Sequence, residues 1–443
     1  MRRSLLMIIL LGLLLTGCVS PPADNGVAIL NTEVPAGDPT DSLAAVGPSP
    51  EAPTATFAPT PTFTLVPPTA TLTASPEPTA VLPPGIILFI GDGMGANQRR
   101  AATWFASGEG GLLMMDNMPV HGSALAVTSD GNSIDSGASA TSMAAGVVTY
   151  RLAVGVDANG NSVSTILELA QASGWAVGLV TTTSLTDATP AAFASHVSER
   201  SEREEIARQM LAHQVDVLLG GGEDDFFSVG QAGCFPGGGK QSSSLSLIED
   251  AIAAGYSYVC SRDDLLALDY GQTDRVLGLF AADGMIRPYA PSLQEMTQAA
   301  LSVLSRDPDG FLLVVEAGQI DWAAHENEAE GVIQLTLGLD AAVVYAQLFA
   351  FDRPNTLIIV TADHETGGMR LNLDGSGSYL QDGPFPMPDG RSFWVDWTSS
   401  SHTSERVPVT AQGPYSEMLI GEIPMTRLYE TMYTYLVYGG LEN

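Results

Sequence analysis

The sequence is poor in positive charge. It has 18 Lys and Arg residues against 50 Asp and Glu residues, which gives a formal net charge of −32. A surface this acidic repels nucleic-acid phosphates, so the composition argues against a nucleic-acid-binding protein. Two interpretations of the acidic excess remain open. It keeps an exported protein soluble, or particular acidic clusters collect divalent metal ions.

Cysteine is also scarce. After Cys18 only Cys234 and Cys260 remain. Two cysteines in an exported chain suggest one disulfide. The alternative is two unpaired thiols, because the sequence does not show whether their Cβ atoms meet.

The N-terminal apolar run is too short to span a bilayer. Residues 5–15 form a run of 11 apolar residues, whereas a membrane-spanning helix needs about 20. A short basic stretch before this run is typical of an export signal. The run ends in Leu15-Thr16-Gly17-Cys18, which resembles the bacterial lipobox, where the chain is cut before a cysteine that is then lipidated. We expect residues 1–17 to be a lipoprotein signal peptide and Cys18 to anchor an exported protein to the cell envelope, on its periplasmic or extracellular side. An ordinary signal peptide with an incidental cysteine is the alternative.

Residues 18–84 have little with which to build a core. They are dense in Pro and Thr, above all over residues 48–84. Proline removes backbone donors and favours extended polyproline conformations, so we expect a semi-rigid linker that holds the body away from a membrane. The ordered body is expected over residues 85–443.

Short apolar runs recur within this body. Residues 86–90 are continuously apolar and are followed by Gly-Asp-Gly, which is typical of a strand buried on both faces. Further runs lie at residues 177–180, 311–315 and 356–360, with helical stretches such as 164–173 and 202–213 between them. Alternating strands and helices predict an α/β fold with three layers, in which helices cover both faces of a mostly parallel central sheet. Residues 222–292 hold glycine and serine runs and both later cysteines, so we expect a small irregular cap insertion there.

Polar residues follow the apolar runs where strands end. In such sheets the ligand site lies beyond the carboxyl ends of the strands. The residues concerned are oxygen or nitrogen metal ligands in type: Asp92, Thr189, Glu316, Asp321, Asp363 and His364. The loops are therefore expected to converge on one polar site.

Three local patterns carry candidate chemistry. Ser136 opens a segment of small residues, and a serine at a helix start lies near backbone N–H groups that favour an anion. The alternative is a serine that only caps the helix. Asp321 and His325 are four residues apart, so they share a helix face that suits Zn²⁺. This spacing alone is weak evidence for a metal site. Asp363 and His364 are stronger evidence, because they directly follow a buried strand. The alternative is that they lie in a solvated loop.

Taken together, six segments resemble the alkaline phosphatase family, in the family's order, over about residues 85–415. The matching segments are residues 90–95, 135–141, 187–191, 316–325, 361–368 and 402–409. The resemblance implies an alkaline-phosphatase-like sandwich and a phosphomonoesterase that works through a phosphoserine on Ser136. It also implies two Zn²⁺ ions and one Mg²⁺ ion. The first zinc would take Asp321, His325 and His402; the second Asp92, Asp363 and His364; and the magnesium Asp92, Thr189 and Glu316.

The resemblance further implies that Arg200 grips the substrate phosphate and that Asp135 helps to orient Arg200. A surface arginine is the alternative for Arg200. Asp187 and Trp322 fall where family members vary, and Trp322 cannot bind phosphate through water as a lysine would. His196 matches no family ligand and is interpreted as structural. His213 has no supporting cluster in the sequence and is interpreted as a surface or packing residue.

Small phosphate monoesters are the expected substrates, and a homodimer is common in the family. Two rival functions remain. One is a phosphodiesterase or another hydrolase of the same superfamily. The other is a non-catalytic surface lipoprotein that binds phosphate or metal.

Overall fold

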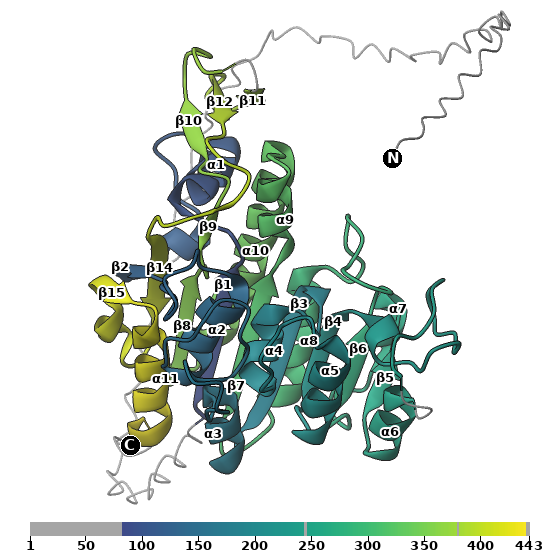
Figure 1. Cartoon of the computed structure of the whole chain (residues 1–443). Coiled ribbons are helices and arrows are strands. Elements are labelled where there is room, and N and C mark those ends of the chain that lie inside the picture. The colour runs from purple at the N-terminus through teal and green to yellow at the C-terminus, as the bar shows by residue number, and fades with distance from the viewer. Residues whose placement is uncertain (1–81, 243–245, 379–380, 440–443) are drawn as a thin grey trace, which may run out of the picture. The chain divides into compact units, whose positions relative to one another are not determined.

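A computed structural model of the chain describes residues 82–242, 246–378 and 381–439. The expected signal peptide, Cys18 and nearly all of the Pro/Thr-rich linker lie outside the described residues. The order of elements begins with β1 and ends with α11 (Figure 1).

A ten-stranded sheet forms the centre of the fold, in the order β15-β2-β14-β8-β1-β7-β3-β4-β6-β5. The strands are β1 (Gly85–Gly91), β2 (Val120–Leu125), β3 (Ala176–Ser184), β4 (Val217–Gly221), β5 (Ser257–Val259), β6 (Val276–Leu279), β7 (Phe311–Ala317), β8 (Thr356–Thr361), β14 (Val407–Gln412) and β15 (Gly421–Pro424). β14 runs antiparallel to both β8 and β2, and the other neighbours pair in parallel. The predicted mostly parallel sheet is confirmed.

The central strands form because their apolar residues are buried on both faces. Every residue of β1, β7 and β8 is buried. Such strands need helices on both sides of the sheet.

On one face α8 (Leu293–Leu304) and α10 (Ala329–Ala350) pack on the central strands, and α1 (Ala96–Ser107) and α9 (Gln319–His325) pack on α10. The other face is covered by α2 (Ser136–Ala145), α3 (Ile166–Ala172), α4 (Ala188–Ala194), α5 (Arg203–Ala212) and α11 (Thr426–Tyr438) (Figure 1). Among the described residues α10 is the one helix long and apolar enough to cross a membrane. It packs on β1, β7 and β8, as a core helix of this fold does.

Smaller elements complete the body. Short 3₁₀ helices are η1 (Met114–Asn117), η2 (Glu223–Asp225) and η3 (Ser416–Leu419). A three-stranded sheet joins β10 (Arg370–Asn372), β12 (Ser392–Asp396) and β11 (Asp382–Pro386), and a two-stranded sheet joins β13 (His402–Thr403) and β9 (Glu365–Thr366).

The segment 222–292 contains regular elements as well as loops. It contains α6 (Leu247–Ala253) and α7 (Arg262–Ala267), and its strands β5 and β6 extend the edge of the central sheet by parallel pairing. Its first part is loop-rich, as its glycines predicted. The regular part was missed because β5 and β6 are only three and four residues long.

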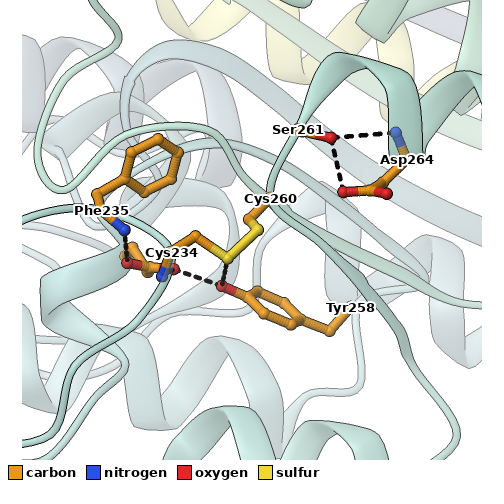
Figure 2. Close-up of a disulfide and its surroundings, with 7 residues drawn as sticks. Cys234, Phe235, Tyr258, Cys260, Ser261 and Asp264 are labelled. Atoms are coloured by element: carbon orange, nitrogen blue, oxygen red, sulfur yellow. Dashed lines mark hydrogen bonds between the residues drawn. A yellow bond between two sulfur atoms is a disulfide. The ribbon is translucent and has the colours of Figure 1, made fainter.

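Cys234 and Cys260 form the expected disulfide within this segment (Figure 2). The loop beside it is fixed by the carboxylate of Glu223, which accepts hydrogen bonds from the backbone N–H of Cys234 at 2.8 Å and of Phe235 at 3.1 Å. The Tyr258 hydroxyl donates to the same carboxylate at 2.6 Å. The cross-link and this buried acceptor together fold a loop that has little apolar surface of its own.

Candidate active site

The expected ligand residues follow the ends of adjacent central strands. Ile90 of β1 is paired with Glu316 of β7 on one side and with Thr361 of β8 on the other. Asp92 and Asp363 each come two residues after this level of the sheet. The parallel register therefore delivers three carboxylates to one edge, where α/β folds bind their ligands.

Asp92, Asp363 and His364 form a buried group whose ligand-type atoms all lie within 4.8 Å of one another. One oxygen of Asp363 accepts hydrogen bonds from the backbone N–H groups of Gly93, at 3.1 Å, and His364, at 2.8 Å. This fixes the carboxylate and leaves its Oδ2 3.0 Å from His364 Nε2. Gly93 has φ +72°, and a Cβ there would lie 2.8 Å from the Asp321 Cα, so the close approach requires glycine.

Ser136 lies against this group, at the first position of α2. Its Oγ is 3.3 Å from Asp92 Oδ2 and 3.4 Å from His364 Nε2. The helix begins here because the side chain of Asp135 caps it, accepting from the backbone N–H groups of Gly137 and Ala138. All ten residues of α2 are buried, and most of its side chains are small. The helix can therefore pack closely, and Ser136 lies in the buried part of the site.

Asp321, His325 and His402 form a second group within the same 4.8 Å limit. His325 Nε2 lies 3.2 Å from Asp321 Oδ2 and 3.0 Å from His402 Nε2. Asp321 and His325 share a face of α9, as their spacing predicted, and His402 arrives from β13.

The far nitrogen of each ring is held by a hydrogen-bond partner. Nδ1 of His325 lies 2.7 Å from the Ser400 carbonyl oxygen, and Nδ1 of His402 lies 2.8 Å from that of Ile134. A carbonyl only accepts, so each Nδ1 carries a proton and donates it. In the neutral ring the Nε2 lone pair then faces the group, which is the orientation of a metal-binding histidine.

Glu316 and Thr189 lie beside the first group. Glu316 is buried and accepts a hydrogen bond from the Thr181 hydroxyl at 2.5 Å. Thr189, in the first turn of α4, has a buried Oγ1 that makes no hydrogen bond of good geometry among the described residues, although it is close enough to Glu316 to lower the pKa of that carboxyl. A buried hydroxyl beside a buried carboxylate gives two oxygens that a cation can share.

Arg200 reaches the site from the loop between α4 and α5. One guanidinium nitrogen donates to Asp187 Oδ1 at 2.6 Å, and another donates to Asp135 Oδ2 at 3.3 Å. The backbone is anchored as well, since the N–H of Arg200 donates to the carbonyl of Leu152 at 2.9 Å. Its side chain is 28% exposed, so the guanidinium is fixed by two carboxylates at a surface open to solvent.

Comparison with known proteins decides the family. The alkaline phosphatase family model matches residues 85–382. This chain belongs to the alkaline phosphatase family.

Two relatives illustrate the match. Alkaline phosphatase 3 of Bacillus subtilis is 32% identical over 70% of this chain and 78% of its own length. The alkaline phosphatase of Escherichia coli is 33% identical over 78% of this chain and 84% of its own length. A solved structure of the alkaline phosphatase from the Antarctic bacterium TAB5, a variant with Mg bound in its M3 site, has a TM-score of 0.68 and 28% identity, over 81% of this chain and 99% of that one. The chain is thus an alkaline phosphatase, an enzyme that hydrolyses phosphate monoesters.

Electrostatic repulsion is strong in the site of this alkaline phosphatase. Burial, followed by the charges of Asp363, Asp321 and Glu316, raises the pKa of Asp92 well above its usual range. Burial, with help from the charges of Asp187 and Asp363, raises the pKa of Glu316 to about 8, despite the hydrogen bond from Thr181. Oδ1 of Asp92 and Oδ2 of Asp363 are buried and accept no hydrogen bond of good geometry among the described residues, and both face His364 Nε2, at 3.6 Å and 3.0 Å. Carboxylates crowded in this way need cations to remain ionised.

In the second group, attraction between the carboxylate and the imidazoles outweighs the effect of burial on the pKa of the carboxyl. Burial alone would raise the pKa of Asp321, but its contact with His325 and the nearby His364 and His402 rings lower it to about 2. The same contact with Asp321 raises the pKa of His325 to about 9. Burial lowers the pKa of His402. The carboxylate of Asp321 thus lies beside two imidazoles, an arrangement that suits Zn²⁺.

Asp187 and Trp322, the two positions at which family members vary, lie in different surroundings. Asp187 caps α4 and pairs with Arg200, so its contact is with the arginine. Trp322 follows Asp321 on α9 and is 41% exposed, which makes it one of the larger exposed apolar side chains near the site. Its ring lies against the backbone at Gly284, where a Cβ would come within 2.5 Å of the indole.

Sequence reasoning missed two hydroxyls in the site. Thr366 Oγ1 donates to Asp321 Oδ1 at 2.5 Å and lies 3.2 Å from His364 Nδ1, so it links the two groups. Thr181 holds Glu316 from the level position on the neighbouring strand β3. Thr366 lies inside a segment that matches the family, and Thr181 directly follows an apolar run; both positions were available as signals.

Proposed function

We propose that this alkaline phosphatase attacks phosphate monoesters with Ser136 and forms a phosphoserine. The observation that carries the proposal is the position of the Ser136 hydroxyl, within 3.4 Å of two members of a buried ligand group and at the start of a helix. The helix N-terminus favours negative charge on the serine oxygen and on the phosphate.

Two zinc ions and one magnesium ion are proposed as cofactors. Asp321, His325 and His402 would hold the first zinc, and Asp92, Asp363 and His364 the second, because nitrogen-containing sets suit Zn²⁺. Asp92, Thr189 and Glu316 would hold the magnesium, because an all-oxygen set suits Mg²⁺. The crowding of buried oxygens that make no well-formed hydrogen bond, on Asp92, Asp363 and Thr189, supports this fit. When bound, such cations lower the pKa of a nearby hydroxyl and offset the charge that develops on the phosphoryl oxygens.

The chain's own residues then have separable roles. Ser136 Oγ loses its proton to solvent and attacks phosphorus; the Oγ–P bond forms as the bond from phosphorus to the alcohol oxygen breaks, and the alcohol leaves after it takes a proton from water. Arg200 donates two hydrogen bonds to equatorial phosphate oxygens, a geometry that its planar fork provides. Asp135 and Asp187 hold that fork in place. Water then attacks the phosphoserine, breaks the Oγ–P bond and releases inorganic phosphate, and Ser136 recovers a proton.

Two rival functions can be weighed against this geometry. A phosphodiesterase of the same superfamily would need room for a second ester group where Arg200 stands. A non-catalytic lipoprotein that binds phosphate or metal would have no need of a buried serine beside the ligand group. Both features favour a monoesterase.

The test is release of phosphate from p-nitrophenyl phosphate by the purified protein, with Ser136→Ala as the control. We expect Ser136→Ala to lose activity by several orders of magnitude while it keeps its metal content. Faster turnover of bis-p-nitrophenyl phosphate by the wild-type enzyme would favour the diesterase. Full activity of the Ser136→Ala variant would exclude a phosphoserine.

We further propose that the enzyme is exported and lipid-anchored through Cys18, after removal of residues 1–17. Residues 18–84 would act as a linker, residues 85–443 as the catalytic domain with its insertion at 222–292, and two copies would form a homodimer. The lipobox-like sequence supports the anchor. Replacement of Cys18 by Ser should move the enzyme from the membrane fraction to the soluble fraction; unchanged membrane association would contradict the anchor. Light scattering would test the dimer.

A further inference from the structure

A third group of ligand-type side chains lies apart from the active-site residues. Glu168 comes from α3, His196 from the loop after α4, and His213 from the end of α5. Their ligand-type atoms all lie within 4.8 Å of one another, the same limit that holds for the two active-site groups. None of the three residues belongs to those groups, so this cluster has no part in the chemistry proposed above.

The distances in the cluster match those in the active site. Glu168 Oε1 lies 2.9 Å from His196 Nε2 and 3.3 Å from His213 Nδ1. The corresponding contact between Asp321 and His325 is 3.2 Å. Ligand atoms of one tetrahedral zinc ion are separated by about 3.3 Å, as follows from metal–ligand distances of about 2.0–2.1 Å.

The orientation of His196 is also that of a metal ligand. Its Nδ1 lies 2.7 Å from the carbonyl oxygen of Gly155, so Nδ1 carries a proton and Nε2 points to the cluster. His325 and His402 have the same backbone-carbonyl arrangement. Such partners fix the ring of a metal-binding histidine.

The other two members are held in place by contacts outside the cluster. Glu168 Oε2 accepts from the backbone N–H of Thr165 at 2.9 Å in a capping box, which leaves Oε1 for the two histidines. The backbone of His213 is held by Gln171, whose side chain donates to its carbonyl at 2.8 Å. Burial lowers the pKa of His213, which favours the neutral ring that a metal needs.

The simpler explanation is an imidazolium–carboxylate pair. The hydrogen bond to Glu168 raises the pKa of His196, as such a pair would. A neutral His213 in its Nδ1–H tautomer would donate to the same oxygen, so protons on the two rings could satisfy both contacts of Glu168 Oε1. A divalent cation would also satisfy both, and the zinc titration below separates the two explanations. The side chains of Glu168, His196 and His213 are 24%, 13% and 25% exposed, so a cation has access and water can complete its coordination.

We propose that Glu168, His196 and His213 bind a divalent transition-metal ion, with Zn²⁺ as the best-matched species. Two imidazoles and one carboxylate with an open position are a common zinc set. The ion ties α3 and α5 to the loop that continues from His196 to Arg200. Arg200 itself is held by Asp135, Asp187 and the Leu152 carbonyl, so the ion is expected to affect the stability of this part of the enzyme rather than the reaction.

The test uses the holoenzyme with its tightly bound metals in place and excess metal removed by gel filtration. Isothermal titration with Zn²⁺ should show one further saturable equivalent in the wild-type enzyme. The thermal midpoint should rise by about 3–4 °C at a free zinc concentration 100 times the dissociation constant. His213→Gln and Glu168→Gln should lose both the equivalent and the rise. His121→Gln, which changes an exposed histidine on β2, should keep both.

Activity separates this site from the active site. His213→Gln and His121→Gln should retain wild-type turnover of p-nitrophenyl phosphate, and Ser136→Ala should retain the extra zinc equivalent. Equal zinc binding by wild type and a correctly folded His213→Gln or Glu168→Gln variant, with folding checked by circular dichroism, would overturn the proposal. Absence of any further equivalent in the wild-type enzyme would overturn it as well.

Discussion

Replacement of Arg200 by Ala should remove most of the enzyme's specific hold on the phosphoryl group. The guanidinium is fixed by Asp187 at 2.6 Å and Asp135 at 3.3 Å, so its remaining N–H groups are pre-oriented. Loss of two hydrogen bonds between a charged donor and a charged acceptor, each worth about 1.5–3 kcal/mol, should cost about 3–6 kcal/mol of transition-state stabilisation. This corresponds to a fall in kcat/KM of about 10²–10⁴-fold.

A graded series of variants tests the geometry. Arg200→Lys keeps the charge but loses the planar fork, so a fall of about 10–100-fold in kcat/KM is expected. Arg208→Ala is the matched control, since Arg208 is exposed and pairs with Glu205 on its own helix. Steady-state kinetics with p-nitrophenyl phosphate, and inhibition by inorganic phosphate, provide the measurements. If Arg200→Ala and Arg208→Ala both stayed within about twofold of wild type, the assignment of Arg200 to phosphate binding would be wrong.

Three further outcomes concern metals, pH and the cross-link. Chelation should abolish phosphatase activity and lower the melting temperature, and Zn²⁺ with Mg²⁺ should restore both; activity that persists after complete removal of metal, verified by elemental analysis, would contradict a metal-dependent reaction. In the metal-free protein the pKa of Glu316 is raised from 4.5 to about 8, so its protonated form contributes stability that is complete below about pH 4.5 and lost as the pH rises to about 8. Calorimetry should show this decline in wild type and a flatter profile in Glu316→Gln, and identical profiles would contradict the role of this carboxyl. Joint replacement of Cys234 and Cys260 by Ser removes a link across 26 residues, which should lower the free energy of unfolding by about 3.5 kcal/mol in urea titrations; a loss below about 1 kcal/mol would show that the rest of the fold already orders this loop.

The central strands could be predicted because strands buried on both faces appear in the sequence as continuous apolar runs. β1, β3, β7 and β8 are runs of apolar residues, since both faces of each strand meet helices. The strands at the edges of the sheet have no such apolar runs. β2 has only six residues, of which two are buried, and β14 contains Pro408, so neither stands out as a strand. Short strands and polar edges depend on the neighbours with which they pair.

The gathering of polar residues at one edge of the sheet could likewise be expected, because Asp92, Glu316 and Asp363 lie at or directly after the ends of buried strands. Their supporting contacts could not. The carbonyl groups of Ile134 and Ser400 orient the histidine rings, and every residue has such a carbonyl. The hydroxyl of Thr366 links Asp321 to His364 only because β9 folds back beside α9. Contacts of this kind depend on the tertiary structure and leave no pattern in the sequence.

The pairing of β1 with β7 and β8 has a consequence for how mutations silence this enzyme. A strand that slips by one residue turns every side chain to the opposite side of the sheet. Ile90 is level with both Glu316 and Thr361, so such a slip would displace Asp92 from the carboxylates of the neighbouring strands. Replacement of a buried apolar residue in β1 can therefore inactivate the enzyme although all of the proposed catalytic and metal-binding residues are still present. Loss-of-function variants should accumulate in this strand as readily as among the ligands themselves.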